Sequence, residues 1–509
     1  MDGPTSPRPF EASATAGTSL PIVPHFTARL SPSEQAQIES LAEQLVRENP
    51  KLIPDDRLRP LLVTDSESGG TLHLDDIGGI TRPNWAENVH FLHDRARLRA
   101  GDGDFVASFE APPDGYEAYC RDQLGLGAPH WLHPAPDQDR SHLAQSCWQD
   151  RNVRNALAAA ARRGELRYIQ PYLGNSAVWQ LADLLHRKSN APLKVVAPHP
   201  ELTRWVNDKL DFSKCIVRLF GADYVPYSEE AANLVTLTRK VRELSEKYPR
   251  LSLKVPDSAG GGGNVVVEAA SVRGLSLEQI RDKIKLLLEK TNWNGETKLL
   301  LGCWETNVHS APSAQLWIPP LGTAKPVIEG LFTQAIDPDT GYFLGSQPAD
   351  LPEETREEMV SLCARLARLY QQLGYIGRCS FDMLLVERQA LPTRIKFIEC
   401  NGRWGGTSLP MTLMNRMFGD WATRPFSTLE CHAEGLEQLE FQNLLTALGS
   451  DVYDRRTGQG KFVLYNPGRM QAHSGINVLS LADSWQAAEG MLKHELPKRL
   501  ASIVASRAT

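Results

Sequence analysis

Residues 396–408, Lys-Phe-Ile-Glu-Cys-Asn-Gly-Arg-Trp-Gly-Gly-Thr-Ser, constrain the fold of this chain most narrowly. They begin as an apolar run typical of a strand. Because strand side chains alternate between faces, Glu399 and Asn401 lie on the same side, where their oxygens could face one metal ion. The glycines that follow expose backbone N–H groups, and Arg403 adds a guanidinium suited to a phosphate. The pattern predicts a strand, a phosphate-binding turn and a helix starting near Ser408, with an ordinary edge strand and glycine turn as the alternative.

The composition is that of a globular protein with several domains. The chain has 509 residues, of which 41% are hydrophobic and 23% charged, enough for roughly three domains. A net charge of -6 and the lack of a Lys/Arg block argue against nucleic-acid binding as the main task. No run approaches the ~20 apolar residues that span a bilayer, and the N-terminus lacks the features of a signal peptide. We therefore expect a cytoplasmic protein without nucleic-acid or membrane partners.

The eight cysteines show no C-x-x-C spacing, which disfavours a zinc site or a disulfide framework. Cys400 lies inside the opening motif, so we considered it as a nucleophile. Strand alternation points it away from Glu399 and Asn401, which favours a buried structural cysteine instead.

The N-terminal part of the chain predicts a tail followed by an α/β domain. Residues 1–28 are rich in Pro, Ser, Thr and Ala, so we expect a flexible tail. A helix is predicted to begin at Ser31, which precedes a proline and an acidic first turn. Farther along, strands at 166–170 and 193–197 alternate with helices, which favours a parallel sheet. No G-x-G-x-x-G joins strand to helix, so a Rossmann nucleotide site is not predicted.

A second informative stretch, residues 252–267, places two apolar strands around consecutive glycines. Such a loop can bring backbone N–H groups close to phosphate oxygens, and Lys254 on the incoming strand adds a positive charge. A Walker A motif is excluded because no Gly-Lys-Ser/Thr follows. A flexible hairpin tip is the alternative. The glycines of this predicted loop are Gly260, Gly261, Gly262 and Gly263.

Asp382 interrupts an otherwise apolar predicted strand, residues 374–386. A carboxylate among large apolar side chains is costly unless it is paired or bound to a metal. Asp382 is therefore the best partner for Glu399 and Asn401. Lys209 could reach a phosphate, although a solvated helix lysine is the default for such a residue.

Lys254 with its glycine loop, Asp382, and the Glu-x-Asn strand occur in the order seen in the ATP-grasp superfamily, which this sequence resembles. The closest resemblance is to the pheganomycin-type peptide ligases. The resemblance covers roughly residues 166–500 and rests on Tyr342-Phe-Leu-Gly345, Gly374-Tyr-Ile-Gly377, Phe381-Asp382 and Glu399-Cys-Asn-Gly-Arg403-Trp-Gly-Gly-Thr407.

The resemblance implies a mixed α/β and α+β architecture, with an ATP-grasp fold between an N-terminal α/β pre-ATP-grasp domain and a small C-terminal α+β domain. The expected boundaries are 1–28 for the tail, 29–200 for the pre-ATP-grasp domain, 201–430 for the ATP-grasp domain and 431–509 for the C-terminal domain.

The same resemblance assigns roles to the site residues. Asp382, Glu399 and Asn401 would hold Mg²⁺, with Mn²⁺ as an alternative ion. Arg403 and Lys254 would be catalytic. The residues expected to bind ATP are Lys209, Lys254, Gly260, Gly261, Gly262, Gly263 and Glu305. Two departures weaken the substrate assignments: Glu305 does not align clearly with the ribose-binding acid, and Ser380 stands where several related ligases carry Arg.

The implied activity is that of an ATP-dependent carbon–nitrogen ligase. It would join a small-molecule carboxylate to an amine through an acyl phosphate, on amino acids or small peptides in specialised metabolism. The alternatives are another ATP-grasp chemistry, such as a carboxylate kinase or a ligase of non-amino-acid substrates, and a non-catalytic ATP-binding regulator. The substrates and the pathway stay open, and a homo-oligomer is one alternative for the assembly.

Overall fold

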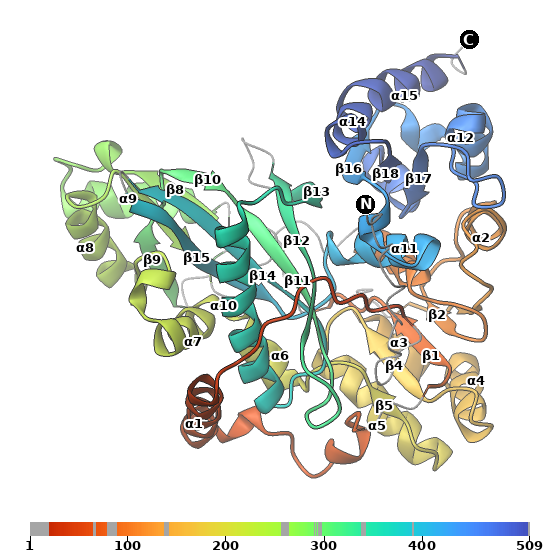
Figure 1. The fold of residues 1–509 in the computed structure, drawn as a ribbon, viewed down its shortest axis with the longest axis horizontal. Coiled ribbons are helices and arrows are strands. Elements are labelled where there is room, and N and C mark those ends of the chain that lie inside the picture. Colours follow the sequence, from red (N-terminus) through yellow and green to blue (C-terminus); the bar gives the residue numbers. More distant parts are fainter. Residues whose placement is uncertain are drawn as a thin grey trace, which may run out of the picture.

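The computed structural model describes residues 20–64, 68–78, 89–136, 142–255, 264–289, 291, 293, 298–336, 343–388 and 391–506. The described strands form three sheets: one parallel, one small and antiparallel, and one large and antiparallel (Figure 1). None of the helices in these ranges is long and apolar enough to cross a membrane.

The N-terminal sheet is parallel and has the strand order β3-β2-β1-β4-β5. Two of its strands and its flanking helices follow the predicted alternation, and apolar side chains of the helices pack with the strands in one core. The sheet elements are β1 (Thr71–Leu74), β2 (Phe105–Ala107), β3 (His130–Leu132), β4 (Tyr168–Pro171), β5 (Lys194–Val195), α3 (Leu143–Gln149), α4 (Arg151–Arg162) and α5 (Ser176–Ser189).

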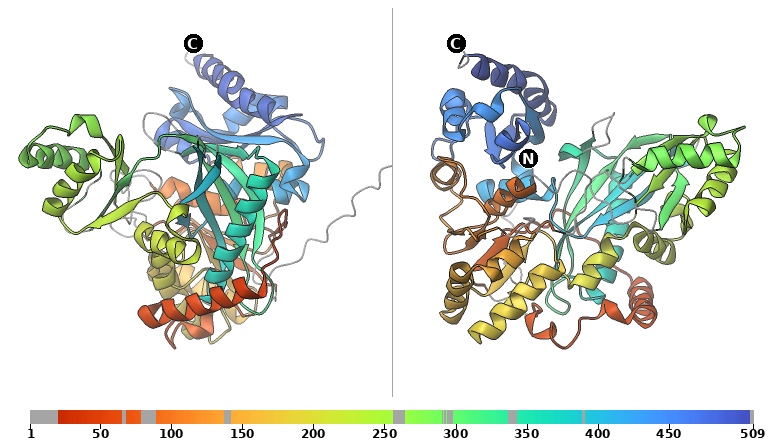
Figure 2. Two further views of the ribbon diagram at one scale, coloured as in Figure 1. Left: turned by 60° about the vertical axis from the view of Figure 1, so that its left-hand side comes forward. Right: turned by 180° about the vertical axis from the view of Figure 1, so that it is seen from behind.

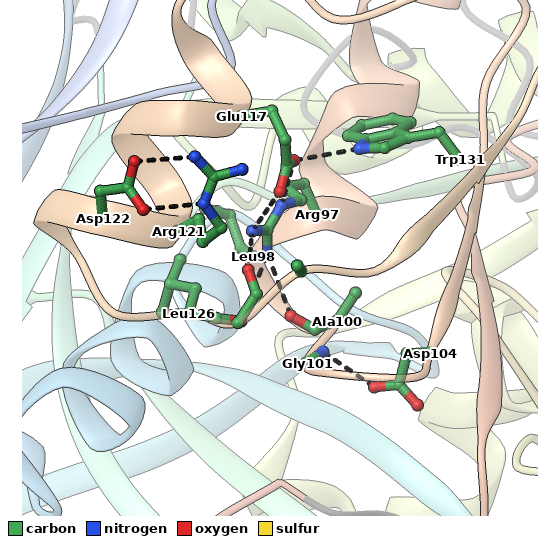
Figure 3. A network of polar contacts seen from close by, with 12 residues as sticks. Arg97, Leu98, Ala100, Gly101, Asp104, Glu117, Arg121, Asp122, Leu126 and Trp131 are labelled. Atoms are coloured by element: carbon green, nitrogen blue, oxygen red, sulfur yellow. Dashed lines mark hydrogen bonds and ion pairs between the residues drawn. The ribbon is translucent and has the colours of Figure 1, made fainter.

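A buried arginine, Arg97, stabilises this domain (Figure 3). It lies in the 3-10 helix η3 (Val89–Leu98) and has no solvent exposure. Its guanidinium donates twice to the carboxylate of Glu117 and otherwise to three main-chain carbonyl oxygens. All its N–H groups are therefore used within the fold, as the burial of a charge requires.

The second sheet has four antiparallel strands in the order β6-β9-β7-β8, and with its two helices it projects from the rest of the molecule (Figure 2). Its core consists of Leu, Ile and Val side chains from both helices and from the strands. The glycines predicted to form the loop between β7 and β8 lie outside the described residues. The elements are β6 (Ser228–Ala231), β7 (Arg250–Lys254), β8 (Asn264–Glu268), β9 (Leu299–Cys303), α8 (Leu234–Ser245) and α9 (Leu277–Glu289).

The large sheet runs β10-β14-β11-β12-β13-β16-β18-β17, with β15 also paired to β14. The helix α10 packs against it, and α1 packs against α10 in the same core. The predicted cap is present, because Ser31 and Glu34 form a reciprocal capping box at the start of α1. The elements are α1 (Pro32–Glu48), α6 (Pro200–Asn207), α7 (Lys209–Phe220), β10 (Val308–Ser310), β11 (Pro312–Ile318), β12 (Val327–Ile336), β13 (Phe343–Pro348), α10 (Glu353–Gln372), β14 (Gly377–Arg388) and β15 (Leu391–Asn401).

The C-terminal strands continue the large sheet, because β16 pairs with β13 through Gly345 and Ser346. The expected boundary between residues 430 and 431 falls inside β16. α11 lies between these C-terminal elements and the parallel sheet (Figure 1). The elements are α11 (Ser408–Phe418), β16 (Phe426–His432), α12 (Phe441–Leu448), β17 (Phe462–Tyr465), α13 (Arg469–His473), β18 (Gly475–Leu481), α14 (Trp485–Gly490) and α15 (Leu496–Ala505).

The described end of the predicted tail differs from the expectation of a flexible segment. From Leu20 onward, Leu20 and Ile22 are buried in a core that also contains C-terminal strands. Phe26 forms a β-bridge with Ile328 of β12. These few apolar side chains pack in a core formed by other parts of the chain, although the local composition is typical of a tail. Residues 1–19 lie outside the described residues.

Candidate active site

The pairing of β14 with β15 brings the predicted metal-binding residues together. Asp382 and Glu399 are direct cross-strand neighbours, and Ser380 lies opposite Asn401 two residues along, on the same face. Asn401 Nδ2 donates to Asp382 Oδ2 at 2.9 Å, and the hydroxyl of Ser313 on β11 donates to Asp382 Oδ1 at 2.6 Å. The strand alternation predicted for residues 396–401 is thus present, and Cys400 is buried on the opposite face, in the core with α10.

The two carboxylates have opposite pKa shifts. Burial, and then the negative charge of Glu399, raises the pKa of Asp382 to about 6. Burial also disfavours the charged form of Glu399, but Lys209, followed by Arg403 and Lys254, brings its net pKa below the usual value. Lys209 Nζ lies 3.3 Å from Glu399 Oε2. The charged form of Glu399 is therefore stabilised, whereas the negative charge of Asp382 is not compensated to the same extent.

This donor set fits Mg²⁺. Two carboxylates and an amide offer hard oxygen ligands, and Mg²⁺ commonly combines one or two carboxylates with phosphate oxygens and water. In the described part of the chain, no three His, Cys, Asp or Glu side chains are placed to hold a metal by themselves. A bound cation would also relieve the repulsion that raises the pKa of Asp382.

Lys209 is held in place by the junction of α6 and α7. Asp208 caps α7 by accepting from the N–H groups of its first turn, and Lys209 is the first residue of this helix. Asn207 accepts from the N–H of Gly402 at 3.0 Å, which ties this junction to the turn after β15. Lys209 is only 5% exposed and Glu399 22% exposed, so the pair is shielded from bulk water.

Lys254 is the last residue of β7 and enters the site from the small sheet. Burial lowers the pKa of its ammonium group, Glu399 opposes that change, and the charge of Lys209 adds to it. Lys254 and Glu399 therefore influence each other's pKa, and the charge of Lys209 influences both, although these residues come from two sheets and a helix.

Glu305, the predicted ribose-binding acid, forms an ion pair with Lys396 of β15, and each side chain is 15% exposed. This contact joins the segment after β9 to the large sheet. Glu305 thus lies where the two sheets meet.

Arg403 follows β15 directly, and its N–H donates to the carbonyl of Asn401 at 2.8 Å. Its positive charge contributes, after Lys209, to the lowered pKa of Glu399, and it partly offsets the rise in the pKa of Asp382. Its guanidinium carbon lies 5.9 Å from the centre of the Tyr172 ring, so Arg403 faces the parallel-sheet domain. The helix predicted after this turn is present as α11 and begins at Ser408.

Two contacts at the site were not predicted. Ser313 could be connected to Asp382 only once the pairing of β11 with β14 was known. Asn207 lies two residues before Lys209, but only the fold shows that its side chain accepts from the N–H of Gly402. Arg378 does not take the place of an arginine at position 380, because it forms a buried ion pair with Glu329 instead.

Residues 93–186 match the family model described as the Pre ATP-grasp domain. This match starts well before residue 166, where the sequence resemblance described above begins. Together with the parallel sheet and the two antiparallel sheets, it confirms the predicted fold class, an ATP-grasp fold with a pre-ATP-grasp domain. A search of curated proteins gives no match.

Solved structures with a similar chain trace include several enzymes. The biotin carboxylase domain of 2-oxoglutarate carboxylase from Hydrogenobacter thermophilus, crystallised with MgADP, ADP and bicarbonate, is 14% identical, with a TM-score of 0.47, over 82% of this chain and 87% of that chain. N5-carboxyaminoimidazole synthetase from Staphylococcus aureus with ADP is 11% identical, with a TM-score of 0.49, over 86% of this chain and 99% of that chain.

D-alanyl-alanine synthetase A from Vibrio cholerae is 12% identical, with a TM-score of 0.36, over 50% of this chain and 71% of that chain. Similarity at this level carries no information about activity or substrate.

Proposed function

We propose that this protein is an ATP-dependent, ADP-forming ligase that joins a carboxylate to an amine through an acyl phosphate. We further propose that it is a peptide ligase of the pheganomycin type, acting on amino acids or small peptides. The observation that supports this best is the register of β14 and β15, which sets Asp382 against Glu399 with Lys209 alongside.

The charged side chains have distinct tasks in this proposal. Lys209 and Lys254 bind the polyphosphate of ATP, and their partial burial strengthens the attraction. Asp382, Glu399 and Asn401 would hold Mg²⁺, which when bound supplies charge neutralisation at the β and γ phosphates. Glu305 lies where the sheets meet and is the proposed contact for the ribose.

Phosphorylation of the carboxylate would give it a good leaving group. A carboxylate does not react with an amine at neutral pH, because oxide would have to leave. In the proposed reaction, a carboxylate oxygen attacks the γ phosphorus and the bond to ADP breaks. The amine nitrogen then attacks the acyl carbon, the bond to phosphate breaks, and the nitrogen loses a proton. Arg403 faces the reacting groups and stabilises first the transferred phosphoryl group and then the oxyanion.

An ADP-release assay across carboxylic acids, with hydroxylamine as the amine, tests this proposal. Hydroxamate formation coupled to ADP release demonstrates an activated acyl group. ADP release that yields an acyl phosphate but no amide with any amine supports a carboxylate kinase instead. ATP binding without turnover on any carboxylate supports a regulator.

The first variant to test is Glu399→Gln. It preserves the shape of the side chain but removes the charge that pairs with Lys209, so we expect ADP release to fall by at least about a hundredfold, as for loss of a group that stabilises the transition state. Glu387→Gln is the matched control, since Glu387 is an exposed carboxylate on β14 that lies beside His309. Wild-type turnover of Glu399→Gln would refute the assignment.

A further inference from the structure

Arg95 and Arg99 have buried guanidinium N–H groups that remain unpaired. Arg99 has no solvent exposure, and its Nη2 donates to Asp75 Oδ1 at 2.6 Å. Its Nε and Nη1 find no hydrogen-bond partner among the described residues. Arg95 is 12% exposed, its Nε donates to the carbonyl of Leu92, and its Nη2 likewise has no partner there. Unpaired buried donors are rare and costly in folded proteins.

Arg97, from the same segment, shows what a purely structural arginine looks like in this fold. Its guanidinium uses every N–H on Glu117 and on main-chain carbonyl oxygens (Figure 3). Arg95 and Arg99 have no such set of partners. Their donors are therefore available for a group that is not part of the chain.

Among the described residues, Asp75 is the carboxylate that forms ion pairs with both arginines. It lies 2.6 Å from Arg99 and 3.3 Å from Arg95. Nearby carboxylates are already engaged, since Glu329 pairs with Arg378, Glu430 pairs with Arg469, and Asp94 accepts from the N–H of Gly468. The arginine donors that find no partner could therefore be satisfied by the oxygens of an added anion.

These donors lie beside the proposed active site. The guanidinium carbons of Arg95 and Arg403 lie 4.4 and 5.9 Å from the centre of the same Tyr172 ring. Arg99 stacks on Trp404, the residue after Arg403, at 4.8 Å. The backbone N–H of Trp404 in turn donates to the carbonyl oxygen of Tyr172 at 3.0 Å.

Asp75 and Tyr172 directly follow β1 and β4 and so mark the carboxyl ends of two adjacent parallel strands. The carboxyl ends of parallel strands are the usual place for ligands in α/β sheets. The unpaired donors therefore lie at an edge suited to a substrate, on the side of Arg403 that faces the parallel sheet.

We propose that Arg95 and Arg99 bind an anionic group, a carboxylate or a phosphate, of the substrate whose carboxylate is activated next to Arg403. The substrate would then carry two anionic groups, one that reacts and one that is held by this arginine pair. This inference rests on the proposed ligase function and assigns a substrate class to the same site.

Direct binding tests the arginine pair without requiring turnover. The full chain is titrated calorimetrically with inorganic phosphate and, separately, with succinate, after Mg²⁺ and a non-hydrolysable ATP analogue have filled the triphosphate site. We expect saturable binding of at least one anion, and the preferred anion distinguishes a phosphate from a carboxylate ligand. Arg95→Gln should weaken that binding by about tenfold to a hundredfold, as loss of charge-assisted hydrogen bonds does.

Controls separate loss of the site from loss of the fold. Arg121→Gln removes an exposed guanidinium that pairs with Asp122, and it should bind the anion like the wild type. Arg95→Lys keeps the charge and should retain part of the affinity. Thermal unfolding of each variant shows whether it is folded. No anion binding to the wild type, or equal binding to Arg95→Gln, would overturn the inference.

A kinetic comparison then links the pair to the reaction. ADP release is measured with glutamate and with glutamine, which differ in one anionic group. We expect the wild type to prefer glutamate by about tenfold or more in kcat/KM, and Arg95→Gln to lose this preference while its KM for ATP stays unchanged. Turnover with no such preference refutes the inference but leaves the ligase. Anion binding without any turnover supports the arginine pair and refutes the proposed ligase.

Discussion

Gly402 shows how closely the turn after β15 packs against the end of α6, near Lys209, the lysine proposed to bind phosphate. A Cβ at this position would lie 2.5 Å from Val206 Cγ2 and 2.9 Å from Asn207 Nδ2. Both residues belong to the end of α6, directly before Lys209. The small size of Gly402 thus allows the turn and the lysine-bearing helix to meet.

Gly402→Ala is expected to destabilise the protein by about 1–3 kcal/mol through overpacking, and to reduce ADP release by displacing Lys209 from Glu399. Urea unfolding and the ADP-release assay measure the two effects. Gly405→Ala is the control, because its Cβ would meet only the Ser408 hydroxyl, at 3.9 Å. If both variants lose activity equally, packing at Gly402 is not what positions Lys209.

At the level of single residues, the sequence predicted those side chains whose chemistry is unusual for their surroundings. Asp382 stands out as a carboxylate in an apolar strand, and Glu399 and Asn401 follow the strand period. Arg95 and Arg99 could not be found in this way, because most arginines lie on the surface and the sequence does not show which are buried. Their neighbours Asp75 and Trp404 come from distant parts of the chain.

Among the elements, α1 depends on a cap that is plainly visible in the sequence. The N–H of Ser31 donates to Glu34 Oε2 at 2.8 Å, and the N–H of Glu34 donates to the Ser31 hydroxyl at 3.3 Å. The helix packs against α10, away from the parallel sheet to which its place in the sequence would assign it. The position of α1 in the sequence therefore does not indicate which sheet it packs near, even though its start is predicted correctly.

Ser31→Ala should destabilise α1 by about 1 kcal/mol, because an N–H of the first turn loses its acceptor. Hydrogen exchange along residues 32–48 measures this change locally. Ser40→Ala, in the middle of the helix, removes only a 3.3 Å contact from Gln44 and should leave exchange nearly unaltered. Faster exchange in both variants alike would mean that the cap does not anchor the helix.

Several strands that the sequence does not predict are short, and some of them carry polar residues. The acidic, glycine-containing segment 65–79 predicts a loop, but the structure has β1 within it, which contains Thr71 and His73. In the fold, His73 is buried and its Nε2 lies 3.3 Å from Asp104 Oδ2, so its polar ring is paired with a residue outside β1. The longer strand β14, predicted over residues 374–386, lies close to these limits in the structure, at Gly377–Arg388.

For the molecule as a whole, the junction of β13 with β16 decides whether the large sheet is continuous. Only two residue pairs make this junction, and a Cβ on Gly345 would lie 1.8 Å from the carbonyl oxygen of Thr428. The backbone of β16 therefore leaves no room for a side chain there.

Gly345→Val should separate the C-terminal strands from the rest of the sheet, because backbone atoms cannot move aside as a flexible side chain can. We expect a loss of about 1–3 kcal/mol or more and earlier proteolysis between residues 433 and 460. Calorimetry and limited trypsin digestion measure these effects. Gly490→Ala, where nothing lies within 4 Å of the added Cβ, serves as the control. Unchanged melting of Gly345→Val would show that the two strands are not coupled.

The core that joins the two ends of the chain also affects how the protein is made. Tyr119 accepts from the N–H of Leu464, 345 residues later, and Leu20 lies in the same core as the last strands. At synthesis rates of about 5–20 residues per second, the ribosome needs on the order of tens of seconds to deliver those partners. During that interval the apolar side chains that later pack around Tyr119 lack these partners, and exposed apolar surface of this kind favours aggregation during folding.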